Sequence, residues 1–416
     1  MNSGLRLLIG IGCLSPLTAG AWEAPTFQGK AGLIVERTLE ADQERFERLY
    51  THLSLTGSIP FEVDQRPREI LYNLGVRGWL TRKAPEPTLD PLTGLPAAEE
   101  KTTAPSVKAE ALLERATLEY NRKRWKFRLG QQELALGEVL GPSVIDLANA
   151  RDYRQPDQFL KSSERLPQLM GTIDYKRKKY GFKLFVSPYP TQMKLPESIQ
   201  HIPLISVPNA HDPEFGGRYN LFWNGLDLKF YALHHQNRSP ILVQDFSDQG
   251  PQLLALQRYE NSVASTFNYA WDYTVLRGEI VRTQAQKNDA RDLTASTVDQ
   301  AVLALDFTSE DQLLLVGQVQ SIAPSQCSIS LRCSQKQFWA GGQIQKPWFS
   351  DILKTNLFFY RRTDQNIVYR KAEIEIDSTL WLLLKLSYED YDGFGRDGLD
   401  FLDHQDRFRV DLQVPF

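Results

Sequence analysis

The feature of this sequence that most constrains its fold is a strict alternation of apolar and polar residues, repeated along nearly the whole chain. Clear examples are residues 180–186, 226–232, 301–307 and 380–386. Successive side chains on a β-strand point to opposite faces, so each of these segments has one apolar and one more polar face. A helical period is almost absent beyond the first residues. The pattern therefore predicts an all-β protein built from amphipathic strands.

The length of the segments indicates a membrane as their surroundings. Each runs for about ten residues, the length that a tilted strand needs to cross a bilayer, whereas strands of soluble sandwiches average about five or six. Short connections such as 121–124 and 224–225 alternate with long ones such as 83–106, 188–215 and 236–256. We predict a transmembrane antiparallel β-barrel of about 18 strands, with 16 as the alternative, with short periplasmic turns and long extracellular loops.

The start of the chain predicts export. Arg6, an apolar run over 7–17 and the small residues 19–21 form the pattern of a cleaved signal peptide. We predict a signal peptide over 1–21 and a barrel over 22–416. A transmembrane anchor is disfavoured because the run is well short of about 20 residues. A lipoprotein signal at Cys13 is a minor alternative.

The end of the chain is a half-apolar strand that stops on an aromatic residue. Its alternating apolar positions are Phe408, Val410, Leu412, Val414 and Phe416. A chain end usually frays, but the last strand of a closed barrel pairs with the first. The segment resembles the terminal strand of Gram-negative outer-membrane proteins, which implies recognition by the barrel-assembly machinery.

Two cysteines remain after signal removal, Cys327 and Cys333. Export places them in an oxidising compartment, so we predict a disulfide between them, with two free thiols as the alternative.

The net charge of −3 gives no indication of a nucleic-acid partner. The moderate shares of hydrophobic and charged residues, 42% and 24%, exclude a disordered chain and a bundle of membrane helices.

One stretch, WKFRLGQQELALGEVLGPSVIDLANARDYRQP over 125–156, resembles a group of porin-like outer-membrane proteins. The group has a strand with Gly-Arg-Gln, then Trp-Gly, then a loop with an Asp and Asn-Pro-Arg-Asp. Gln131, Leu136 and Ala150 depart from that pattern. The matching positions are Gly130, Gln132, Gly137, Asp146, Asn149, Arg151 and Asp152. The resemblance implies a porin-type barrel and says little about the solute.

The residues of this stretch also have a direct physical interpretation. Trp125, Phe127 and Leu129 are expected to face lipid, and Lys126, Arg128 and Gln132 the lumen. The loop over 139–167 is expected to fold inward and narrow the pore. We predict that Asp146, Asn149, Arg151 and Asp152 hold it against Arg218, Arg277 and Glu279. A charged lumen sorts solutes by charge and size, but the same charges would be needed for purely structural pairing.

Catalytic and metal-binding arrangements are weak. His234 and His235 are neighbours on a strand and point to opposite faces, so they make a poor metal pair. Ser239 lies near His235 without a motif that places them together. The acidic stretch 390–406 lacks the glutamate that ends a calcium loop. We therefore expect no enzyme, no metal and no cofactor.

Two functions remain. The first is a porin that lets small polar or amphipathic solutes diffuse through a charged constriction. The alternative is a closed barrel that acts as a surface receptor, adhesin or assembly scaffold. The expected partners are outer-membrane lipid and lipopolysaccharide, the barrel-assembly machinery and a small-molecule solute, with a homo-oligomer left open.

Overall fold

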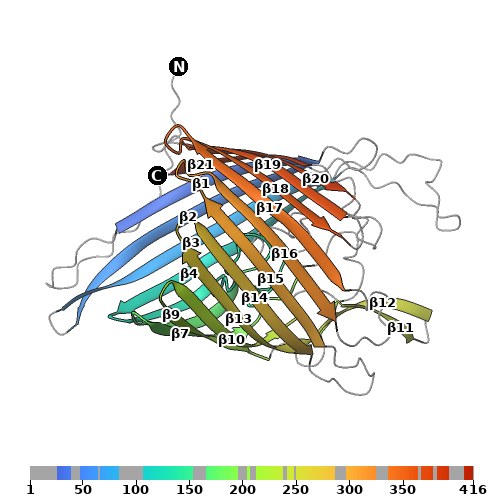
Figure 1. The fold of residues 1–416 in the computed structure, drawn as a ribbon, viewed down its shortest axis with the longest axis horizontal. Coiled ribbons are helices and arrows are strands. Elements are labelled where there is room, and N and C mark those ends of the chain that lie inside the picture. The colour runs from blue at the N-terminus through green and yellow to red at the C-terminus, as the bar shows by residue number, and fades with distance from the viewer. Residues whose placement is uncertain are drawn as a thin grey trace.

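A computed structural model describes residues 26–38, 47–63, 66–83, 106–152, 165–194, 204–206, 212–237, 241–247, 250–285, 297–324, 336–363, 367–377, 382–392 and 407–415. Its dominant feature is one closed antiparallel barrel of 18 strands (Figure 1). The barrel strands are β1 (Thr26–Thr38), β2 (Glu47–Val63), β3 (Arg66–Lys83), β4 (Ser106–Arg122), β5 (Trp125–Gln132), β6 (Gln168–Lys176), β7 (Tyr180–Tyr189), β9 (Glu214–Trp223), β10 (Leu226–Gln236), β13 (Tyr259–Trp271), β14 (Thr274–Ala285), β15 (Thr297–Thr308), β16 (Leu314–Pro324), β17 (Gln337–Trp348), β18 (Leu353–Arg362), β19 (Ile367–Asp377), β20 (Leu383–Asp392) and β21 (Arg407–Pro415).

Each barrel strand pairs with the barrel strand that follows it in the chain, and β21 closes the ring against β1. The closing register runs from Lys30 opposite Pro415 to Thr38 opposite Arg407. Phe408, Val410, Leu412 and Val414 therefore lie in a paired strand, while Phe416 lies outside the described residues. The predicted fold class and the count of 18 strands are confirmed.

The predicted rhythm of short and long connections is also present. Short turns join β4 to β5, β9 to β10 and β13 to β14 at 123–124, 224–225 and 272–273. Asn224 and Gly225 both have positive φ, 48° and 81°, as a two-residue hairpin turn requires. Both termini of the barrel lie at the same rim as these turns, which is the periplasmic rim in an outer-membrane barrel.

One part of the long connections was not predicted. Residues within 188–215 and 236–256 were expected to be loops, but they contain β8 (Leu204–Ser206), β11 (Ile241–Ser247) and β12 (Gly250–Gln257). These three strands form a separate small sheet in which β12 pairs antiparallel with β11 and parallel with β8. Loop assignments based on length alone miss such secondary sheets.

The outer and inner faces of the wall differ as the alternation predicted. Trp125, Phe127 and Leu129 on β5 are exposed, whereas Lys126 and Arg128 between them are half-buried. The same exposed apolar pattern recurs from β1 to β21. A closed barrel with an apolar outer face satisfies its backbone internally and places the chain in the outer membrane as an integral protein.

Several predictions concern parts outside the described residues. They are the signal peptide over 1–21, the disulfide between Cys327 and Cys333, and most of the acidic stretch 390–406. Among the described residues, no helix is long and apolar enough to cross a membrane.

Candidate pore constriction

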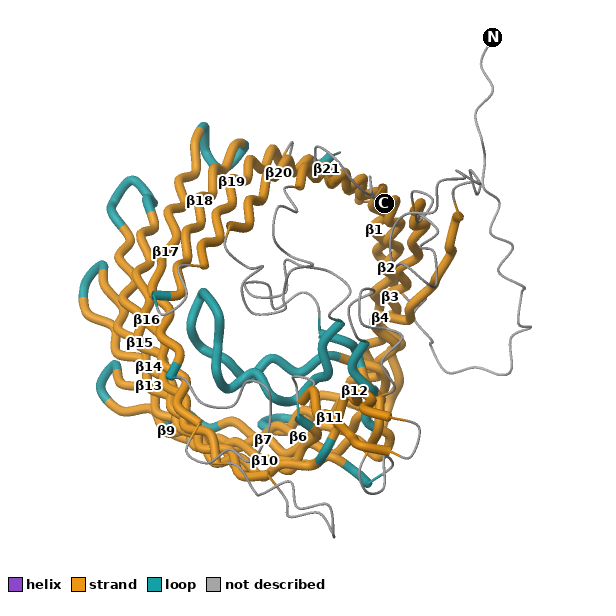
Figure 2. Tube along the Cα trace, turned by 90° about the vertical axis from the view of Figure 1, so that its right-hand side faces the viewer, coloured by secondary structure: helices purple, strands orange, loops and turns teal. Residues whose placement is uncertain are grey.

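The segment after β5 folds into the barrel instead of continuing outward. Residues 133–152 lie inside the ring of strands, where Figure 2 shows loop segments across part of the lumen. The segment 165–167 then leads into β6, and the amide of Leu166 donates to the carbonyl of Ala150 at 2.7 Å. We call residues 133–152 the inner loop. Of the loop predicted to fold inward, 139–167, residues 139–152 lie inside the barrel, and 153–164 lie outside the described residues.

Glu279 on β14 is the main polar anchor of the inner loop. Its Oε1 accepts hydrogen bonds from the amides of Glu138 and Val139 at 2.6 and 3.1 Å. Its Oε2 accepts bonds from Ser143 Oγ and the amide of Val144 at 2.7 and 3.0 Å. The Glu279 residue is 1% exposed, so these four donors replace its hydration.

Further wall residues bind the loop from neighbouring strands. Lys229 Nζ on β10 lies 2.6 Å from Glu138 Oε1, and Asn268 Nδ2 on β13 donates to Glu138 Oε2 at 3.1 Å. The Tyr231 hydroxyl donates to the carbonyl of Leu136, and Gln318 Nε2 on β16 donates to the carbonyl of Pro142. The contacts spread over β10 to β16, so the loop is attached to one broad sector of the wall.

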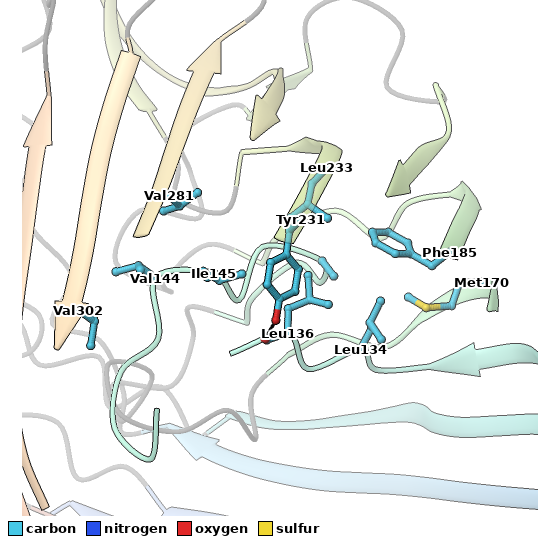
Figure 3. Close-up of a cluster of buried hydrophobic side chains, with 11 residues drawn as sticks. Leu134, Leu136, Val144, Ile145, Met170, Phe185, Tyr231, Leu233, Val281 and Val302 are labelled. Atoms are coloured by element: carbon cyan, nitrogen blue, oxygen red, sulfur yellow. Dashed lines mark hydrogen bonds between the residues drawn. The ribbon is translucent and has the colours of Figure 1, made fainter. Parts of the chain in front are cut away.

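An apolar cluster lies between the inner loop and this sector (Figure 3). Leu134, Leu136, Val144, Ile145 and Ala148 from the loop pack with residues from five strands, β6, β7, β10, β14 and β15. The wall members are Met170, Phe185, Tyr231, Leu233, Val281 and Val302. Full burial of one such side chain contributes about 1.5–3 kcal/mol, so the cluster stabilises the docked loop together with Glu279.

The base of the loop is closed by residues of the motif. Asn149 Oδ1 accepts from the amide of Leu134 at 2.8 Å, and its Nδ2 donates to the carbonyl of Leu166 at 3.1 Å. Asp146 Oδ2 lies 2.5 Å from Arg165 Nε. The predicted contacts of Asp146 and Asn149 with Arg218, Arg277 or Glu279 are therefore wrong, because both side chains bind within the loop and its return segment.

The other motif positions have structural roles as well. Gln132 Nε2 donates to the carbonyl of Met170 at 2.9 Å. Arg151 and Asp152 form isolated β-bridges with Arg165 and Lys194. Asp152 is 5% exposed.

The predicted wall charges lie on three separate strands, β5, β9 and β14. Lys126 and Arg128 both pair with Glu119 on β4, at 2.6 and 2.8 Å. Arg277 pairs with Asp306 on β15 at 2.5 Å. Arg218 is half-buried on β9, where it stands opposite Lys183 and Tyr231 in the strand register.

A polar cavity of about 480 Å³ adjoins the start of the inner loop on the β1–β5 side. The charged residues that line it are Arg115, Glu119, Arg128 and Glu133. Burial, the largest effect, raises the pKa of the Glu133 carboxyl to about 7. Its charge therefore changes in the physiological pH range.

Sequence reasoning missed Arg115, Glu133, Glu138, Ser143 and Lys229. Arg115 and Lys229 lie on strands, and the alternation of apolar and polar residues there could have placed them on the inner face. Glu133, Glu138 and Ser143 lie in the inner loop, whose sequence has no such alternation. His235 is buried and bonds to Ser262, and His234 bonds to Asn261, so the two rings diverge as expected. The described ranges hold no group of three or more metal-ligating side chains.

Comparisons with solved structures show proteins of the same fold. The chain is similar to OccD3 (OpdP) of Pseudomonas aeruginosa, with 11% identity, a TM-score of 0.52, and coverage of 95% of this chain and 91% of that chain. It is also similar to OccK5 (OpdH) of the same organism, with 8% identity, a TM-score of 0.51, and 96% and 99% coverage. For OccK7 (OpdD), also of that organism, the values are 8%, 0.51, 94% and 99%.

No protein-family model matches the sequence, and no curated protein matches it. Identity near 10% shows the fold alone. The chain therefore has the fold of Gram-negative outer-membrane porins, a closed 18-strand barrel, and the likeness extends over nearly its full length.

Proposed function

We propose that this protein is a passive outer-membrane channel for small polar or amphipathic solutes. The observation that carries the proposal is the inner loop, which is held inside the barrel by Glu279 and by the apolar cluster. A loop fixed in this way narrows the lumen without depending on a ligand. The mechanism is diffusion through the space between the inner loop and the facing wall.

The wall that the loop leaves uncovered supplies the polar surface for this path. Arg115 and Arg128 lie there with Glu119 and Glu133 around the 480 Å³ cavity. Charges of both signs at a narrow point produce a field across the lumen, which sorts solutes by charge and dipole. The alternation of polar residues on the inner face of the strands supports the same interpretation.

Single-channel conductance of the refolded full-length protein in a planar bilayer tests the proposal. Discrete steps are expected, and Arg128→Gln, which removes a positive charge from the wall, is expected to shift the ion selectivity toward cations. Arg282→Gln is the matched control, because Arg282 is exposed on the strand that carries Glu279 and pairs with Asp299 away from the loop. Its selectivity should equal that of the unmodified protein.

A demonstrably folded barrel without conductance would overturn the proposal and favour a closed receptor, adhesin or scaffold. If the protein conducts but Arg128→Gln leaves its ion selectivity unchanged, the channel function stands and the charged constriction on this wall is rejected.

A further inference from the structure

Seven cationic side chains gather at one place on the short-turn rim of the barrel. They come from the adjacent ends and turns of β4–β5 and β6–β7, and all are exposed. The amide of Lys176 donates to the carbonyl of Arg124 at 3.0 Å, so the two turns are in contact. We call this group the basic sector: Arg122, Lys123, Arg124, Lys176, Arg177, Lys178 and Lys179.

The basic sector is a local feature and not a property of the whole rim. The other short turns that the structure describes, at 224–225, 272–273, 309–313 and 349–352, hold no lysine or arginine. Three of them carry acids instead, namely Asp272, Glu310 with Asp311, and Asp351. Seven like charges repel one another, and a bound anion would lower the electrostatic energy of the group.

Aromatic side chains on the lipid-facing surface lie directly beside the basic sector. Trp125 is 4.7 Å from Tyr175 and 5.6 Å from Phe182 between ring centroids. Trp125 and Tyr180 are 38% and 37% exposed. Aromatic residues at this height form the girdle of a barrel at the membrane–water interface, so the cations next to them lie at the level of the lipid headgroups.

Two of the arginines are held in place by this aromatic group. Arg177 Nε donates to the Tyr175 hydroxyl at 2.7 Å, and its guanidinium lies 5.6 Å from the centre of the Tyr180 ring. Arg124 also bonds to Tyr175. A guanidinium fixed by its neighbours loses less side-chain entropy when it binds a phosphate group.

We propose that the basic sector binds the anionic headgroup of a phospholipid in the periplasmic leaflet. Ammonium and guanidinium groups from two touching turns would surround the phosphate, while Trp125 and Tyr180 contact the glycerol and the upper acyl chain. The aromatic neighbours favour a lipid over an acidic periplasmic protein or a free anion, because they face the bilayer and not the aqueous space.

The test measures lipid binding by the purified full-length protein with native mass spectrometry. Phosphatidylglycerol and phosphatidylcholine are added separately, and the variant carries Lys123→Gln, Lys178→Gln and Lys179→Gln. These three side chains avoid the contacts with Tyr175, so the barrel should fold normally. Basic residues near an anionic surface contribute roughly fivefold each in affinity, so the triple variant should lose on the order of 100-fold for phosphatidylglycerol.

Lys346→Gln is the matched control. Lys346 also lies at the short-turn rim beside an aromatic ring, 5.8 Å from Trp348, but it stands apart from the basic sector. Its phosphatidylglycerol affinity should be unchanged, and phosphatidylcholine binding should be weak in every variant. Unmodified protein should keep its bound lipid in millimolar inorganic phosphate.

Three results would overturn the proposal. Equal affinity for the two lipids would exclude recognition of the headgroup charge. Displacement of the lipid by inorganic phosphate would indicate a free-anion site. Unchanged lipid binding in the triple variant, with or without a change in channel selectivity, would assign the cations to another role, such as attraction of solutes or of an acidic protein.

Discussion

The substitution Glu279→Gln tests whether the inner loop is held by its carboxylate anchor. An amide of nearly the same shape keeps one oxygen, which can still accept two of the four hydrogen bonds. Its NH₂ group then faces Ser143 Oγ and the amide of Val144. The hydroxyl can turn and accept, but the backbone amide of Val144 is left without an acceptor.

The expected cost follows from these contacts. An orphaned buried amide costs about 1–3 kcal/mol, and loss of the charge weakens each retained hydrogen bond, so the docked loop loses roughly 2–4 kcal/mol. This shifts the equilibrium between docked and released loop by a factor of roughly 30 to 1,000. Conductance and current noise should rise, and larger solutes should enter.

The assay is single-channel recording, combined with liposome swelling for a series of sugars of increasing size. Asp174→Asn is the matched control, because Asp174 is a buried carboxylate on the inner wall whose partner is Lys183 on the next strand, 2.9 Å away. It should leave loop-dependent noise unchanged. If Glu279→Gln and Asp174→Asn give the same conductance, noise and size limit, the anchoring argument is refuted.

Three further predictions follow from single positions. Acidification from pH 8 to pH 6 should increase the anion selectivity of the channel in reversal-potential measurements. The reason is that Glu133, whose pKa is raised to about 7, becomes neutral and removes a negative charge from the cavity. The variant Glu133→Gln should not show this shift in selectivity. Gly130→Ala should lower the unfolding temperature of the barrel, measured by heating samples before gel electrophoresis. The φ of Gly130 is 131°, and a Cβ there would lie 2.0 Å from the carbonyl oxygen of Ala116. A Cβ at Gly317 would meet no neighbour, so Gly317→Ala should leave the unfolding temperature unchanged. Asn149→Ala should increase proteolysis within the inner loop by roughly 30-fold, because it removes two hydrogen bonds worth about 1 kcal/mol each without changing the strands.

The strands were predictable because their physical constraint is local. Alternation over about ten residues fixes both the secondary structure and the face that each side chain occupies, as Trp125, Lys126 and Phe127 show on β5. The partners of loop residues were not predictable in the same way. Asp146 binds Arg165, 19 positions away, and Glu138 on the inner loop binds Lys229 on β10. No periodic pattern relates such pairs.

One signal for the loop was nevertheless present in the strands. The inner face of a water-filled barrel is polar, yet Phe185, Leu233, Val281 and Val302 are apolar residues at inward positions. Left in contact with water, they would forgo the free energy of burial, so their presence on several strands of the same side of the barrel indicates a covering element inside it. The inner loop is that element, and its apolar face from Leu134 to Ala148 matches the patch (Figure 3). Inward apolar residues that cluster on one side of the barrel therefore mark where such a loop docks, even when the contacts of the loop itself cannot be derived from its sequence.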